Sequence, residues 1–117
     1  MKKVFYLKTC GTCRKIMNLF DLSDWELREL KSQNISEEEL AELYKFTNSY
    51  EALFSKKSTQ IKARNIDVKT LKESDFKTLI LEHYSFLKRP VFVTDKEIFV
   101  GNDKKNIENL TDFFNEF

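Results

Sequence analysis

Two cysteines carry the chemistry that this sequence can perform. Cys10 and Cys13 are separated by Gly11 and Thr12 and come directly after the apolar run 4–7. A short continuous apolar run predicts a buried strand, so the cysteines fall in the turn between that strand and a following helix. The start of a helix offers unpaired N–H groups and partial positive charge, which favour a thiolate. The spacing therefore indicates a nucleophilic sulfur at Cys10 and a second sulfur at Cys13 that resolves its adduct as an internal disulfide.

Two other roles are open to this cysteine pair. Free cysteines often behave as small buried hydrophobes, but a turn followed by Arg14 and Lys15 is electropositive and partly exposed, which lowers the pKa of a thiol. A structural zinc site usually needs four protein ligands, and beyond the two thiols only His83 is an obvious soft donor. We therefore expect a redox pair and no bound metal.

Composition limits the size of the protein and its partners. The chain has 117 residues, of which 41% are hydrophobic, enough for one core but not for two. Its 20 basic and 19 acidic side chains give a net charge of +1, so we expect no direct nucleic-acid partner and no membrane partner. The start of the chain lacks the apolar segment of a secretory signal, and no stretch approaches transmembrane length, which predicts a cytoplasmic protein.

The first elements form a crossover unit. A helical stripe starts at the cysteines and fades near 21–23. Residues 25–30 are compatible with a strand or a helix, because their apolar positions are two and three apart. We favour the strand, since strand, helix and parallel strand complete a right-handed crossover.

The middle of the chain is predicted to be helical, and its end is predicted to form a hairpin followed by one more helix. Ser36 and Glu39 form a capping box that predicts a helix to about Thr47. A largely helical stretch over 50–66, broken near 58–59, and a third helix from about 74 to 84 follow. Then come a β-hairpin, with strands over 91–93 and 98–100 and a turn at 95–96, and a last helix with apolar positions 107, 110, 113 and 114.

This layout is similar to that of the ArsC/Spx family of arsenate reductases and their relatives. The resemblance covers nearly the full length, and its motifs are the segments 10–15, 53–57 and 87–93, followed by Val100 and Gly101. It implies an α/β, thioredoxin-like fold: a small mixed β-sheet flanked by helices, with an inserted helical subdomain. The implied single domain spans 1–117, with its core at about 1–35 and 85–117 and the insertion at about 36–84.

The resemblance also implies roles for individual residues. It makes Cys10 the nucleophile and Cys13 its partner, and it places Arg89 across the site, before a cis Pro90. A cis bond is plausible there because it is nearly confined to X-Pro pairs. The implied substrate-binding residues are Thr12, Arg14, Lys56 and Pro90.

Two functions from different classes follow from the resemblance. One is a thiol-disulfide oxidoreductase that acts on a small oxyanion or disulfide, with glutathione, glutaredoxin or thioredoxin as reductant. The other is an Spx-like redox-sensing regulator that binds the C-terminal domain of the RNA polymerase α subunit. Two arginines with which arsenate-reducing members bind their anion are replaced here, one by Ser55 and one by Val100 or Gly101. These replacements favour a substrate other than arsenate, the Spx-type branch, or a family fold that has lost activity.

Overall fold

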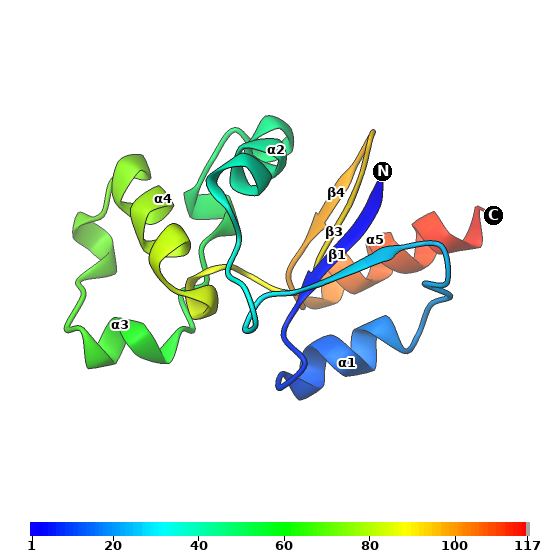
Figure 1. Ribbon diagram of the computed structural model, residues 1–117, viewed down its shortest axis with the longest axis horizontal. Coiled ribbons are helices and arrows are strands. Elements are labelled where there is room, and N and C mark those ends of the chain that lie inside the picture. Colours follow the sequence, from blue (N-terminus) through cyan, green and yellow to red (C-terminus); the bar gives the residue numbers. More distant parts are fainter. Residues whose placement is uncertain (117) are drawn as a thin grey trace. The chain divides into compact units, whose positions relative to one another are not determined.

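The computed structural model of the protein describes residues 1–116 (Figure 1). These residues form two compact units. One contains Met1–Ser32 and the chain from Arg89 onward, and the other contains Gln33–Lys88. The insertion expected over 36–84 falls within this second unit.

The first unit is built on a four-stranded mixed sheet. Its strands are β1 (Lys2–Tyr6), β2 (Glu26–Glu29), β3 (Val91–Thr94) and β4 (Ile98–Val100), in the order β2-β1-β3-β4. β1 runs parallel to β2 and antiparallel to β3, and β3 is antiparallel to β4. The predicted strand over 25–30 and the predicted hairpin are thereby confirmed, as is the mixed sheet.

One face of this sheet carries the apolar core of the unit. Val4, Phe92 and Phe99 are register partners on neighbouring strands, so their side chains share a face. They pack with residues of α1 (Gly11–Met17) and α5 (Lys104–Asn115), which lie along the same face (Figure 1). Because α1 begins directly after Cys10, this packing fixes the direction in which the cysteine turn leaves the sheet.

A backbone link closes the sheet next to the predicted cis proline. The Arg89–Pro90 peptide bond is cis, as expected. The Pro90 carbonyl accepts a 2.9 Å hydrogen bond from the N–H of Gly101, which has a φ of 93° that favours glycine. Nδ2 of Asn106 in α5 donates to the Gly101 carbonyl over 2.8 Å. The start of β3 is therefore tied to α5 as well as to its neighbouring strands.

The second unit is helical and carries its own core. Its elements are α2 (Glu37–Thr47), η1 (Glu51–Leu53), α3 (Thr59–Ala63), η2 (Val68–Thr70), α4 (Glu73–Glu82) and η3 (Tyr84–Phe86). The predicted capping box of Ser36 and Glu39 is present, and α2 ends at Thr47 as expected. Phe54 stacks on Phe86 with a centroid distance of 5.4 Å. Of the helices formed by residues 1–116 in both units, none is long and apolar enough to span a bilayer.

Two expectations about helices are wrong. α1 ends at Met17 instead of near 21–23, because the chain turns tightly there and Phe20 stacks on Phe114 of α5 at 4.4 Å. The stretch 50–66 is helical only in η1 and the short α3. Between them Phe54 forms an antiparallel bridge with Leu87, so long-range backbone pairing replaces the helix that the local pattern favoured.

Candidate active site

Cys10 lies at the junction of β1 and α1. It occupies the N-cap position of α1 with an extended backbone, φ −93° and ψ 108°. Its N–H donates to the Leu7 carbonyl over 3.0 Å, and its carbonyl accepts from the Arg14 N–H over 3.2 Å. The residue is partly exposed and its sulfur is a free thiol. Cys10 is therefore a partly exposed residue whose backbone is held on both sides.

Several groups favour ionisation of the Cys10 thiol. Partial burial opposes its ionisation, but the backbone N–H and the thiol of Cys13, the positive charge of Arg89 and the Thr12 N–H together hold its pKa below that of an ordinary cysteine thiol. The arrangement therefore stabilises the thiolate, which is the nucleophilic form of cysteine.

Cys13 is the opposite case. Its side chain is fully buried, on the same side of α1 as Ile16. Burial raises the pKa of its thiol to about 12, and the hydrogen bond and negative charge of Cys10 act in the same direction. In this state Cys13 is a proton-bearing donor to Cys10, so the two thiols differ in how readily they ionise.

The cation that acts on both sulfurs is Arg89. It is half-buried and lies just before Pro90 and the start of β3, which pairs with β1, the strand that leads into the cysteine turn. Its charge lowers the pKa of Cys10 and opposes the raised pKa of Cys13. Arg14, expected beside the thiolate, is exposed, and no hydrogen bond or ion pair holds its side chain within residues 1–116. Of these two arginines, only Arg89 is among the groups that shift the pKa values of the thiols.

The remaining predicted residues have separate environments. Thr12 is exposed in the first turn of α1, and Pro90 is buried at the start of β3. Lys56 belongs to the helical unit, where its Nζ forms a 2.7 Å ion pair with Glu51. His83 ends α4, as expected, and its Nδ1 accepts a hydrogen bond from the Ser85 N–H.

One residue of this region was not predicted. Glu29, at the end of β2, accepts hydrogen bonds from the backbone N–H groups of Lys8 and Ser32. No sequence motif marks it. Its position in the sequence could have predicted its place. An acidic residue at the end of a strand parallel to β1 must lie at the edge of the sheet where the cysteine turn begins.

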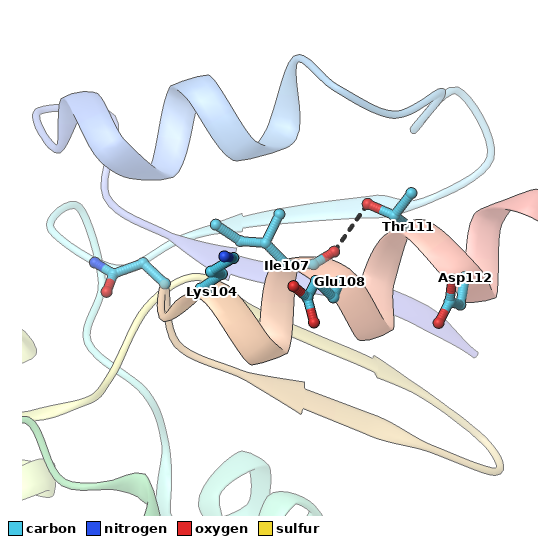
Figure 2. A pocket seen from close by; sticks show the side chains of 6 residues that line it. Lys104, Ile107, Glu108, Thr111 and Asp112 are labelled. Carbon is cyan, nitrogen blue, oxygen red and sulfur yellow. Dashed lines mark hydrogen bonds between the residues drawn. The ribbon is translucent and has the colours of Figure 1, made fainter.

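A groove on the surface of this unit is separate from the thiols. It has a volume of about 560 Å³ and follows the exposed side of α5 (Figure 2). Lys104, Glu108 and Asp112 line it, and Thr111 Oγ1 donates to the Ile107 carbonyl over 2.9 Å. Neither cysteine contributes to this groove. Within residues 1–116 no three side chains of the types that bind metals cluster together.

Comparison with known proteins identifies the family of this chain. Residues 5–110 match the model of the ArsC family. The chain belongs to the ArsC family. This confirms the family expected from the motifs, and with it the thioredoxin-like fold class.

Curated and solved relatives of this ArsC family member differ in their names. The global transcriptional regulator Spx of Staphylococcus epidermidis is 24% identical over 113 residues, which cover 94% of this chain and 86% of the relative. The arsenate reductase from Vibrio cholerae has a similar structure, with a TM-score of 0.70, 18% identity and 95% of each chain covered. An arsenate reductase related protein from Brucella melitensis has a TM-score of 0.68 at 22% identity, covering 94% of this chain and 93% of its own. At these identities the structural likenesses show the fold.

Proposed function

We propose that this ArsC family protein is a thiol-disulfide oxidoreductase in which Cys10 attacks an oxidised sulfur and Cys13 resolves the adduct. The observation that carries this proposal is the opposite treatment of the two thiols, because the pKa of Cys10 is lowered while that of Cys13 is raised to about 12. In such a pair, the thiol with the lower pKa reacts first as a thiolate, and the thiol with the higher pKa stays protonated until the second step.

The first step is a displacement at sulfur. The Cys10 thiolate attacks one sulfur of a substrate disulfide, a new S–S bond joins Cys10 to that sulfur, and the other substrate sulfur leaves as a thiolate. Arg89 supports this step because its charge favours the attacking thiolate at neutral pH. Partial exposure of Cys10 allows the substrate to approach.

The second step uses Cys13. In the mixed disulfide Cys10 no longer carries negative charge, so one of the influences that raise the pKa of Cys13 is lost. Cys13 attacks the Cys10 sulfur, the S–S bond between Cys10 and the substrate breaks, and the departing substrate thiolate takes up the Cys13 proton, which leaves a Cys10–Cys13 disulfide and a free substrate thiol. The dithiol loses two electrons and the substrate disulfide gains them. Glutathione, glutaredoxin or thioredoxin then returns the two electrons, as expected for a cytoplasmic protein.

The experiment is a comparison of two single variants in the reduction of a small disulfide. Cys10→Ser should abolish turnover, with a loss of roughly 1000-fold or more, because the nucleophile is removed. Cys13→Ser should still release one substrate thiolate and then accumulate the Cys10 mixed disulfide, which mass spectrometry detects. Wild-type turnover in Cys10→Ser with an intact fold would contradict the proposal.

The same assays test an oxyanion as the alternative substrate class. Arsenate with glutathione and glutaredoxin is offered in parallel with the disulfide. Arg14, which is exposed and unpaired within residues 1–116, is the side chain that would bind such an anion. Turnover of arsenate that is lost in Arg14→Gln, without turnover of the disulfide, would move the function to oxyanion reduction.

A second function is an Spx-like redox-sensing regulator that binds the C-terminal domain of the RNA polymerase α subunit. The observation that favours it is that curated relatives covering most of this chain are named as Spx transcriptional regulators. In this function the Cys10–Cys13 disulfide changes binding without turnover. Pull-down with the isolated α C-terminal domain, using reduced and oxidised protein, distinguishes the two functions, and the absence of binding in both states would exclude the regulator.

A further inference from the structure

The carboxylate of Glu29 joins two loops at one edge of the sheet. Glu29 is the last residue of β2 and the register partner of Tyr6 in the parallel strand β1. Its Oε2 accepts from the Lys8 N–H over 3.1 Å, and its Oε1 accepts from the Ser32 N–H over 2.7 Å. Each oxygen therefore binds a different loop, one that leads to the cysteines and one that leaves β2.

The first of these loops is the turn that presents Cys10. The Cys10 N–H donates to the Leu7 carbonyl over 3.0 Å, so Lys8 lies inside a four-residue turn that ends at the nucleophile. Leu7 is buried, whereas Lys8 and Thr9 are exposed. The core holds the start of this turn, and the Glu29 carboxylate holds its middle through the Lys8 N–H.

The backbone on the other side of the carboxylate is also fixed. The Leu30 N–H donates to the Tyr6 carbonyl over 2.8 Å, and the Leu30 side chain is fully buried. The backbone of Glu29 is therefore fixed at the end of β2, and its carboxylate cannot move together with the cysteine turn. A carboxylate fixed on one side and bonded to a loop on the other restricts the loop.

The ionisation state of Glu29 suits this role. Slight burial opposes ionisation, but the N–H groups of Ser32 and Lys8 lower the pKa of the carboxyl to about 2. Glu29 is consequently charged at every pH at which Cys10 can react. Hydrogen bonds to a charged acceptor are stronger than those between neutral groups.

We infer that Glu29 is a positioning residue for Cys10, whose carboxylate holds the turn from Leu7 to Cys10 so that the sulfur meets the N–H groups of α1 and the charge of Arg89. This inference deepens the proposed function and rests on it for the reaction that Cys10 performs. The geometry that it uses comes from β2 and the cysteine turn alone. It adds to the site a residue that need not touch the substrate.

The direction of the expected effect separates positioning from simple charge. If Glu29 acted on Cys10 only through its negative charge, then Glu29→Gln would lower the pKa of Cys10 and speed its alkylation. If Glu29 positions the turn, the same substitution weakens the hold on Lys8 and the sulfur loses part of its stabilisation. The pKa of Cys10 should then rise and alkylation at neutral pH should slow.

The test measures the rate at which iodoacetamide alkylates Cys10 in the full chain from pH 5 to pH 10. After digestion, mass spectrometry quantifies the peptide that contains Cys10. For Glu29→Gln we expect a rate at pH 7 lower by roughly threefold or more, since the rate follows the thiolate fraction. Glu26→Gln is the matched control, because Glu26 is exposed on the same strand and lies 3.6 Å from Lys3 Nζ. It removes the same charge and should leave the rate unchanged.

Glu29→Asp is the second variant, in case Glu29→Gln unfolds. It keeps the charge but shortens the side chain by one methylene group, so we expect intermediate slowing. Wild-type or faster alkylation in a folded Glu29 variant would overturn the inference, as would equal slowing in Glu26→Gln. The rate of Cys10 alkylation can be measured whether or not the protein reduces a substrate. Failure of the wild-type protein to reduce disulfides would therefore count against the proposed function alone, and unchanged Cys10 reactivity would count against Glu29 alone.

Discussion

The two units of this chain use charged side chains in different ways. In the sheet unit, Arg89 changes the acidity of both thiols, and Glu29 binds two backbone N–H groups. In the helical unit, the cations of Lys56 and Arg64 form ion pairs of 2.7 Å with nearby carboxylates on exposed surface. Exposed ion pairs of this kind contribute little to stability.

This difference shows that the type of a charged residue does not predict what it does; its position in the fold must also be known. Arg89 and Arg64 are both arginines at the ends of elements, but only Arg89 is among the groups that alter the Cys10 thiol. Arg89 acts because it lies just before β3, a strand next to β1, at the edge of the sheet from which α1 begins. The predictions below test this contrast between the sheet unit and the helical unit.

The largest expected effects come from the two cores. Phe92→Ala and Phe54→Ala each remove a fully buried ring and should each lower the free energy of unfolding by about 3–5 kcal/mol. Phe92 packs in the cluster that contains Ile16, one turn from Cys13, so its loss should also make Cys13 easier to alkylate. Urea titrations and Cys13 labelling measure both effects. Equal exposure of Cys13 in Phe54→Ala would remove the contrast between the units.

The two thiols should differ strongly in reactivity. At pH 8 we expect Cys10 to react with iodoacetamide at least about 100 times faster than Cys13, which is buried and whose pKa is raised to about 12. The thiolate is the reactive form, so the Cys10 rate should rise with pH and level off at a lower pH than the rate of an ordinary cysteine thiol. The Cys13 rate should keep rising above pH 10. Similar rates for both cysteines in the folded protein, as in the urea-unfolded chain, would contradict the site as described.

Removing an arginine should change the reactivity of Cys10 if it is Arg89 of the sheet unit but not if it is Arg64 of the helical unit. Arg89→Gln removes the positive charge that favours the Cys10 thiolate, so we expect the pKa of Cys10 to rise and its alkylation at pH 7 to slow roughly tenfold. Arg64→Gln is the matched control in the helical unit and should leave the rate unchanged. Arg89→Lys should restore most of the rate, since the charge is kept. Equal slowing in both glutamine variants would mean that net charge, not the placement of Arg89, sets the reactivity.

The smallest effect concerns the capping box of α2. Ser36→Ala removes the side chain that accepts the Glu39 N–H and should lower the free energy of unfolding by about 1 kcal/mol. Ser74→Ala, in the exposed first turn of α4, should have little effect. Neither variant should change the rate of Cys10 alkylation. A slower rate in Ser36→Ala would show that the helical unit influences the thiol.

Much of the fold was predictable because its signals are local. The capping box of α2, the strand before the cysteines and the hairpin after Pro90 each depend on residues a few positions apart, and each is present. The helical stretch over 50–66 failed for the opposite reason. Phe54 pairs with Leu87 across 33 positions, and no local pattern contains that partner.

The sequence by itself determined the family, the order of the elements and which two sulfurs could react. The cysteine spacing and the apolar patterns that show this each lie within a short segment. Only the tertiary structure decided which charges act on those sulfurs. Arg89 lies 79 positions after Cys10, and Glu29 lies 21 positions after Lys8, so both reach the cysteine turn through strand pairing. Electrostatic and hydrogen-bond effects depend on distance in space, and that distance is set when the sheet forms.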